Sequence, residues 1–189
     1  MIDGKALITE SEYQALAALV TATTGDVLEV GTAYGVTAAR LAGQFPDRRI
    51  VSVDFWGQCA MAGSRPEFKN YYMLNTKDLP NAELLEGDSK AVLKELAAAR
   101  RRFGVVFVDA DHSIDGVYAD ATNGWPLVGP DGFLVFHDYD EAHFGVRQGV
   151  NLWSDLAVLK RVPLVDSMLC VAKGERAAEF YQDIARDRK

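Results

Sequence analysis

Five short apolar runs, each with a carboxylate in or beside its carboxyl end, constrain the fold of this chain more than any other feature. They cover residues 27–31, 50–54, 82–88, 105–111 and 133–138, and segments of helical character separate most of them. Runs that are apolar throughout are typical of strands buried on both faces of a parallel sheet. Strand–helix alternation predicts the same arrangement. We therefore expect an α/β domain with helices on both faces of the sheet.

The helical segments are predicted from capping and spacing. Thr9 and Glu12 have the spacing of a capping box, and apolar residues then recur on one helical face. The connection 55–82 is long and irregular. A connection of this length is often a lid or a binding loop, and the alternative is an ordinary loop with a short surface helix. Further helices are expected at 35–43, 89–102, 113–128, 143–157 and 175–187.

The final third of the chain changes character. The runs 158–165 and 167–173 are separated by one residue, which suits an antiparallel hairpin and leaves no room for a crossover. Residues 129–132, GPDG, predict a turn before the fifth strand. Arg100, Arg101 and Arg102 are placed by the pattern in the last turn of a helix, where positive charge suits the helix dipole.

Length and charge exclude several classes of protein. The 189 residues suit a single domain, spanning 1–189, with a core of its own. A formal charge of −7 and the absence of a basic run disfavour nucleic-acid binding, and no apolar run is long enough for a membrane helix. No signal peptide is evident, and Cys59 and Cys170 are far apart, as expected of free thiols in the cytoplasm.

The carboxylates at the strand ends indicate a ligand site. In open α/β sheets the ligand crevice lies beyond the carboxyl ends of the strands. Acids follow that edge from the first strand to the fifth, although like charges repel one another. A cationic ligand rich in hydroxyl groups, with or without a metal ion, explains this arrangement best. These acids are Glu29, Asp54, Asp88, Asp109, Asp111 and Asp138, and His137 precedes the last of them.

The turn after the first run discriminates between ligand types. Gly31, Ala33 and Gly35 form G-x-A-x-G, with Val36 where a nicotinamide site would carry its third glycine. Glu29 lies inside the strand, where a pyrophosphate site would not favour a carboxylate. The turn therefore suits close backbone approach to a positively charged ligand without phosphate. S-adenosylmethionine, which carries an ammonium and a sulfonium, meets both conditions.

Five segments resemble class I S-adenosylmethionine-dependent methyltransferases, and within them the small O-methyltransferase-like group of cephalosporin-hydroxylase-like and sugar O-methyltransferase relatives. The resemblance spans roughly residues 25–173. It implies a Rossmann-like methyltransferase fold: a doubly wound, mostly parallel seven-stranded sheet with a C-terminal antiparallel hairpin. The segments are VLEVGTAYGVTAARLA, VSVDFWG, LLEGDS, VVFVDADHSIDGVYAD and GPDGFLVFHDY.

The resemblance also implies the cofactor residues. Glu29 would face the methionine ammonium, and Asp54 would accept hydrogen bonds from the ribose hydroxyls. Asp88 and Ser89 would lie beside the adenine amino group, although Ser89 is equally suited to a helix N-cap. An aromatic residue after the second strand would pack near the adenine or in the core. The complete set is Glu29, Gly31, Thr32, Ala33, Tyr34, Gly35, Asp54, Phe55, Trp56, Asp88, Ser89 and Asp109.

The chemistry is expected between the fourth and fifth strands, because all three histidines of the chain fall in or beside those strand ends. Related metal-dependent O-methyltransferases imply a divalent cation, Mg²⁺ or another, held by Asp109, His137 and Asp138. Such a cation would acidify an acceptor hydroxyl. Without a metal, His112 or His137 would be the general base, with Asp111 as a further candidate.

These features predict S-adenosylmethionine-dependent methylation, directed at oxygen, of a small hydroxylated metabolite such as a sugar, polyketide or phenol. The segments 55–82 and 139–153 would form the walls of the acceptor site, and a homodimer is one arrangement that the chain end suggests. Two alternatives stay open. The chain could be a catalytically silent S-adenosylmethionine-binding module, or an NAD-dependent oxidoreductase, which the missing third glycine and the position of Glu29 inside the strand argue against.

Overall fold

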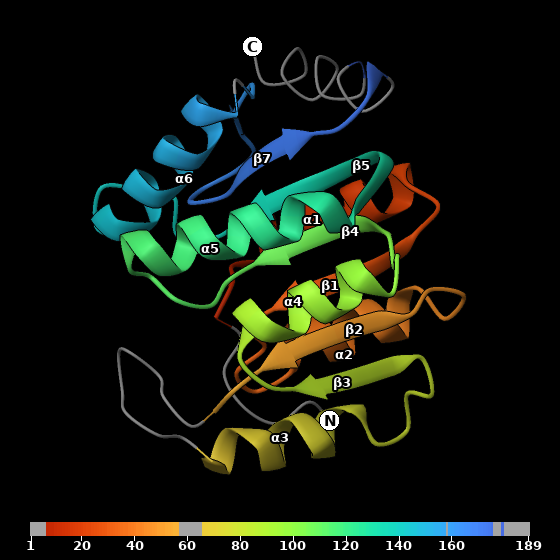
Figure 1. Ribbon diagram of the computed structural model, residues 1–189. Coiled ribbons are helices and arrows are strands. Elements are labelled where there is room, and N and C mark those ends of the chain that lie inside the picture. Colours follow the sequence, from red (N-terminus) through yellow and green to blue (C-terminus); the bar gives the residue numbers. More distant parts are fainter. Residues whose placement is uncertain (1–6, 57–65, 158, 176–178, 180–189) are drawn as a thin grey trace.

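The computed structural model describes residues 7–56, 66–157, 159–175 and 179, and within these ranges seven strands form one sheet (Figure 1). The strand order is β3-β2-β1-β4-β5-β7-β6. Strands β1 to β5 pair in parallel, whereas β7 is antiparallel to both β5 and β6. The predicted doubly wound sheet with a C-terminal hairpin is therefore confirmed. The strands are β1 (Asp26–Val30), β2 (Ile50–Asp54), β3 (Ala82–Glu86), β4 (Phe103–Val108), β5 (Val128–Phe136), β6 (Val162–Pro163) and β7 (Leu169–Ala172).

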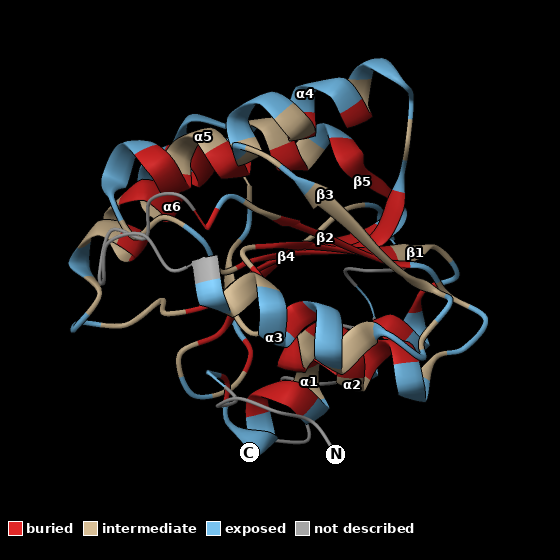
Figure 2. Ribbon diagram, turned by 90° about the horizontal axis from the view of Figure 1, so that it is seen from below, coloured by how far each residue is buried: buried red, intermediate tan, exposed pale blue. Residues whose placement is uncertain are grey.

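Helices cover both faces of the sheet. Helices α1, α2 and α3 lie on one face, and α4, α5 and α6 lie on the other (Figure 2). A short 3₁₀ turn, η1, follows α5 and contains Pro126, so the helix predicted over 113–128 ends at Gly124. The helices are α1 (Glu10–Ala22), α2 (Val36–Gln44), α3 (Pro66–Thr76), α4 (Ser89–Ala98), α5 (Ile114–Gly124) and α6 (Phe144–Leu156), and η1 spans Trp125–Leu127.

Each central strand contributes to two separate cores, which explains why its sequence is apolar throughout. Along β4, Val105 and Phe107 pack with residues of α1 and α2, whereas Val106 and Val108 pack with residues of α4 and α5. Side chains alternate between the two faces of a strand, so a strand covered on both faces has few positions for a polar residue, and Glu29 of β1 and Ser52 of β2 are the buried exceptions in the central strands. The parallel arrangement in turn brings the carboxyl ends of β1, β2, β4 and β5 to one edge.

The capping box of α1 is confirmed. The Thr9 hydroxyl accepts a hydrogen bond from the Glu12 amide at 3.2 Å, and the Glu12 carboxylate accepts one from the Thr9 amide at 2.8 Å. Two amides that the helix leaves without partners are thereby satisfied. The buried face of α1 includes Tyr13, Leu16 and Val20, as the spacing predicts.

The connection 55–82 is less irregular than expected, because it contains α3. This helix lies at one edge of the sheet, where Tyr72 is buried but Tyr71, Met73 and Leu74 are exposed. A helix that buries so narrow a face needs few apolar positions, so its sequence lacks the periodicity of a core helix. The alternative of a loop with a short surface helix is therefore confirmed for residues 66–76.

Helix α4 ends earlier than predicted, so the three arginines follow the helix instead of forming its last turn. Arg100 adopts a left-handed conformation with φ of 57°. Its amide donates to the Ala97 carbonyl, and the Arg101 amide donates to the Leu96 carbonyl. These two hydrogen bonds form a Schellman motif, usually built around glycine. The side chain of Arg101 then lies 3.2 Å from Glu83 of β3.

The predicted turn 129–132 lies inside β5 as a bulge. Phe103 of β4 pairs with Val128 of β5, and Val105 pairs with Phe133. Residue 104 of β4 therefore lies opposite residues 129–132 of β5, which bulge out of the ladder. A bulge of this kind keeps the strand continuous although its sequence contains proline and glycine. The last predicted helix, 175–187, lies largely outside the described residues. None of the described helices has the length and apolar character needed to cross a membrane.

Candidate active site

The turn after β1 is built for close backbone packing. Gly31 has φ of +84°, and a Cβ on this residue would lie 2.0 Å from the carbonyl oxygen of Asp109. Gly35 has φ of +72°, and a Cβ there would lie 2.5 Å from the ring of Tyr72. No side chain fits at either position, so both glycines are required by the packing of this turn.

Asp54, at the end of β2, holds the same turn from the opposite side. Its Oδ2 atom accepts hydrogen bonds from the amides of Thr32 at 2.8 Å and Ala33 at 2.9 Å. Ala33 has φ of +45°, so an alanine occupies a left-handed position that favours glycine. Burial raises the pKa of Asp54, although these amide hydrogen bonds oppose the shift.

Glu29 lies inside the sheet beneath this turn. It is 2% exposed, and its carboxylate accepts a hydrogen bond of 2.8 Å from the Ser52 hydroxyl of β2. Burial raises the pKa of Glu29 to about 7, because the nearby hydroxyls of Ser52 and Thr32 do not fully offset the loss of solvent. The nearby carboxylates of Asp109 and Asp54 shift the pKa further in the same direction.

The two aromatic residues after β2 have different surroundings. Trp56 belongs to the core, and its indole N–H donates to the Ala33 carbonyl at 3.0 Å. Phe55 is 54% exposed at the strand end, so it is the member of the pair that remains accessible to a ligand. Tyr34 stacks on Phe68 of α3, with ring centroids 4.1 Å apart.

At the end of β3, Asp88 and Ser89 begin α4. Asp88 is its N-cap, and its side chain accepts from the Lys90 amide at 2.8 Å. The Ser89 hydroxyl donates to the Asp120 carboxylate at 2.6 Å. The N-cap of α4 is therefore Asp88 and not Ser89. The Ser89 side chain instead connects α4 to α5 through its hydrogen bond to Asp120.

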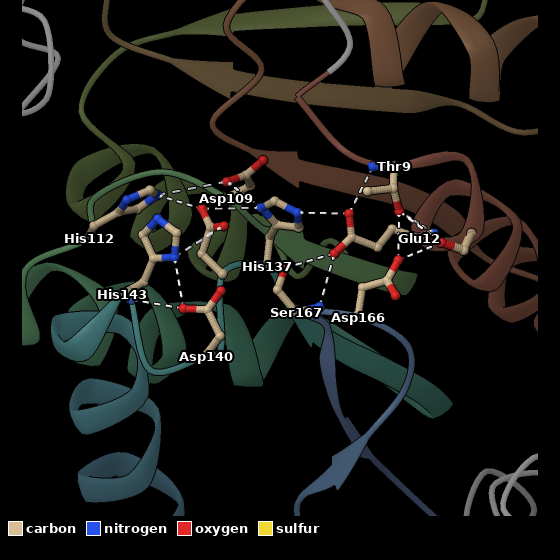
Figure 3. Close-up of polar contacts among 11 residues, drawn as sticks. Thr9, Glu12, Asp109, His112, His137, Asp140, His143, Asp166 and Ser167 are labelled. Atoms are coloured by element: carbon tan, nitrogen blue, oxygen red, sulfur yellow. Dashed lines mark hydrogen bonds and ion pairs between the residues drawn. The ribbon is translucent and has the colours of Figure 1, made fainter.

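Acids and histidines from the ends of β4 and β5 converge, as predicted (Figure 3). His112 Nε2 lies 3.2 Å from Asp138 Oδ2. His137 Nδ1 lies 3.2 Å from the same oxygen and 3.4 Å from Asp109 Oδ1. His143, at the start of α6, lies 3.6 Å from Asp138 Oδ1. All three histidine rings thus face the single carboxylate of Asp138.

The acids and histidines of this cluster shift one another's pKa values. Burial favours neutral His137, but the carboxylates of Asp109 and Asp138 outweigh it and raise the pKa of His137 to about 11. Burial would likewise raise the pKa of Asp109, but His112 and His137 lower it to about 2. The carboxylate of Asp109, 3.9 Å from His112 Nε2, raises the pKa of His112 against a smaller effect of burial.

The residues predicted to hold a divalent cation fit that role. His137 is 7% exposed, and its Nδ1 makes no hydrogen bond although two carboxylate oxygens face it. The distances of 3.2 and 3.4 Å match the separation of about 3.3 Å between ligands that share one ion at about 2 Å. Asp109, His137 and Asp138 therefore offer three donor atoms around one point.

Other predicted residues lie apart from this cluster. Asp111 accepts from the Ser113 amide at 2.8 Å, and its side chain occupies the space above Gly116 at the start of α5. Tyr72 and Trp153, which were expected in the acceptor walls, are instead buried in the two cores. Residues 57–65 of the predicted acceptor wall lie outside the described residues.

Glu12 joins the cluster without having been predicted as a site residue. Its carboxylate lies 3.2 Å from His137 Nε2, and both side chains are buried. The capping box accounts fully for the spacing of Thr9 and Glu12 in the sequence, and nothing in the pattern relates α1 to the end of β5. This contact depends on the tertiary fold alone.

Comparisons with known proteins agree with this fold. A family model described as a methyltransferase domain matches residues 28–139. The solved structure of the O-methyltransferase NovP has a TM-score of 0.73 at 15% identity, covering 92% of this chain and 84% of that one. An O-methyltransferase from Bacillus cereus in complex with SAH has a TM-score of 0.68 at 15% identity, covering 91% and 84%.

CalS11, a TDP-rhamnose 3'-O-methyltransferase of calicheamicin biosynthesis, has a TM-score of 0.67 at 18% identity, covering 87% of this chain and 78% of that one. At such identities, these structures show a shared fold. Curated protein sequences give no significant match. The family model covers more than half of the chain and includes the turn after β1, the end of β2 and the cluster beyond β4 and β5. The chain belongs to the methyltransferase-domain family.

Proposed function

We propose that this protein transfers the methyl group of S-adenosylmethionine to a hydroxyl oxygen of a small metabolite. The observation that carries the proposal is the turn at residues 31–35, held by Asp54 and underlain by Glu29. This turn presents backbone and negative side chains where a dinucleotide site would present amides to a pyrophosphate. A cationic nucleoside without phosphate suits these surroundings.

The cofactor roles follow the geometry of this edge. Asp54 uses Oδ2 to hold the turn, which leaves its second oxygen as an acceptor for ribose hydroxyls. Phe55 offers an exposed aromatic surface for the adenine. Glu29 and Asp109 supply negative charge next to Gly31, where the methionine ammonium would lie.

The reaction is an in-line displacement at the methyl carbon. The acceptor oxygen forms a bond to this carbon while the carbon–sulfur bond breaks, and the electron pair of that bond remains on sulfur as S-adenosylhomocysteine is released. The hydroxyl proton passes to a base. Asp109 and His112 lie where such a base is needed, at the edge between the cofactor turn and the β5 end, whereas the raised pKa of His137 leaves it protonated and unable to accept the proton.

Asp109, His137 and Asp138 are the residues that would hold a divalent cation. Such an ion would lower the pKa of the acceptor hydroxyl and fix its orientation. His112 lies 3.2 Å from Asp138 and is the nearby imidazole that could receive the proton. His143 and the exposed Phe144 at the start of α6 would form part of the acceptor wall.

Two observations support oxygen as the methylated atom: the acid–histidine cluster, and the structural similarity to O-methyltransferases. Because one of them acts on TDP-rhamnose, sugar nucleotides are proposed as acceptors alongside phenols and polyketides. A panel of these compounds, incubated with the protein, labelled S-adenosylmethionine and Mg²⁺ or Mn²⁺, tests the proposal. Label transfer to oxygen supports it. Binding of the cofactor without transfer to any acceptor would favour the silent binding module.

A further inference from the structure

Glu12 and His137 are 125 positions apart in the sequence, yet they form a buried pair at the edge of the site. Glu12 Oε2 lies 3.2 Å from His137 Nε2. Glu12 is 2% exposed and His137 is 7% exposed. A buried carboxylate is costly unless its oxygens are satisfied, so this contact needs a reason beyond the capping of α1.

The Glu12 carboxylate is fixed on both oxygens (Figure 3). Oε2 accepts from the Thr9 amide at 2.8 Å as well as facing His137. Oε1 accepts from the Ser167 hydroxyl at 2.7 Å and from the Ser167 amide at 3.2 Å. Donors from α1 and from the turn between β6 and β7 therefore prevent the carboxylate from rotating away from the imidazole.

A fixed acceptor at Nε2 determines what the other ring nitrogen can do. When Nε2 donates its hydrogen to Glu12, a cation that displaces the second ring proton meets a lone pair on Nδ1. That lone pair faces Asp109 Oδ1 and Asp138 Oδ2 at 3.4 and 3.2 Å. Three electron-rich atoms directed at one point are the arrangement of a cation site, and a carboxylate on the remote nitrogen is the usual partner of a metal-binding histidine.

We infer that Glu12 is a positioning residue that holds His137 so that Nδ1 becomes the nitrogen ligand of a divalent transition-metal ion between Asp109 and Asp138. The inference rests on the cation position in the proposed function and adds the class of ion. One imidazole nitrogen with two carboxylate oxygens favours Mn²⁺, Co²⁺ or Zn²⁺ over Mg²⁺, which prefers oxygen ligands and retains its water.

The test measures binding of Co²⁺ alone, by its visible absorption and by calorimetry, to the wild type, Glu12→Gln and Thr9→Ala. Glu12→Gln removes the charged acceptor and leaves the size of the side chain. Thr9→Ala breaks the same capping box but leaves the Glu12–His137 contact. Both variants should unfold at lower denaturant concentration than the wild type. Thr9→Ala loses the N-cap hydroxyl, and Glu12→Gln replaces one acceptor oxygen by an amino group that faces buried donors.

Only Glu12→Gln should weaken Co²⁺ binding, by about 10- to 100-fold, whereas Thr9→Ala should stay within about twofold of the wild type. The inference is overturned if Glu12→Gln binds Co²⁺ within about twofold of the wild type, or if Thr9→Ala weakens it equally. A measurement on the wild type alone is also decisive. Binding of Mg²⁺ as tight as that of Co²⁺, or no binding of Co²⁺, overturns the inference.

Titration of the same preparations with S-adenosylhomocysteine separates this inference from the proposed function. A wild type that binds the nucleoside but not Co²⁺ refutes the role of Glu12 and leaves methyl transfer standing. A wild type that binds Co²⁺ but not the nucleoside refutes the proposed function and leaves the cation site standing.

Discussion

The Ser52 hydroxyl donates a 2.8 Å hydrogen bond to the Glu29 carboxylate, directly across the parallel pair of β2 and β1. Both side chains are buried, so Glu29 is held inside the sheet at a cost in stability whenever it is ionised. A carboxylate retained at such a position suits a role in ligand binding, because function commonly opposes stability at binding sites.

Replacement Glu29→Gln should therefore change the pH dependence of stability. Burial raises the pKa of Glu29 to about 7 from 4.5, so between these pH values the folded state holds a proton that the unfolded chain has lost. Stability from this group is lost as pH rises through that window, and glutamine does not titrate. In urea unfolding, the free energy of unfolding of the variant relative to that of the wild type should rise by about 1–3 kcal/mol from pH 5 to pH 8. An equal difference at both pH values would contradict the assignment.

The packing of Gly31 leads to a second prediction. Gly31→Ala would place a Cβ 2.0 Å from the Asp109 carbonyl oxygen at φ of +84°. We expect a loss of at least about 2 kcal/mol in the free energy of unfolding, together with loss of S-adenosylmethionine binding. Gly43→Ala is the matched control, because a Cβ on this residue of α2 meets nothing within 4 Å. The control should be more stable than the wild type by about 0.5–1 kcal/mol.

Ala33 offers the opposite substitution. Its φ of +45° is unfavourable for an L-amino acid other than glycine. Ala33→Gly should therefore stabilise the protein by about 0.5–1 kcal/mol, because relief of this strain outweighs the greater freedom of glycine in the unfolded chain. The midpoint of urea unfolding measures the change. A variant less stable than the wild type would show that the turn is not strained at this residue.

Asp54→Asn separates the two tasks of this carboxylate. The asparagine carbonyl can still accept from the Thr32 and Ala33 amides, so stability should change by less than about 1 kcal/mol. Its amino group cannot accept from a ribose hydroxyl, so S-adenosylhomocysteine affinity should fall by about 10- to 100-fold in calorimetry. Asp47→Asn, at an exposed position before β2, serves as control and should leave affinity unchanged. Unchanged affinity of Asp54→Asn would remove this residue from the cofactor site.

Much of the sheet could be predicted from the sequence, because a strand buried on both faces permits almost no polar residue. The order of acids along the strand ends also predicted which residues meet, and His137 and Asp138 do lie beside Asp109. Segments that bury a narrow face were predicted poorly. Helix α3 makes its main buried contact through Tyr72, so its sequence lacks the repeated apolar positions from which a helix is predicted.

Contacts between distant segments could not be predicted at all. Glu12 satisfies the rules of helix capping, and these rules say nothing about the turn at Ser167 that fixes its other oxygen. The left-handed conformation of Arg100 could not be predicted either, because arginine has no preference for it. It results from the chain reversal between the end of α4 and the start of β4. Such positions are determined by the assembled fold.

The most direct measurement is calorimetric titration of the wild-type protein with S-adenosylmethionine and, separately, with NAD. The turn at residues 31–35 and its surrounding carboxylates predict saturable one-to-one binding of S-adenosylmethionine and no binding of NAD. Tight binding of NAD without measurable heat from S-adenosylmethionine would contradict the account.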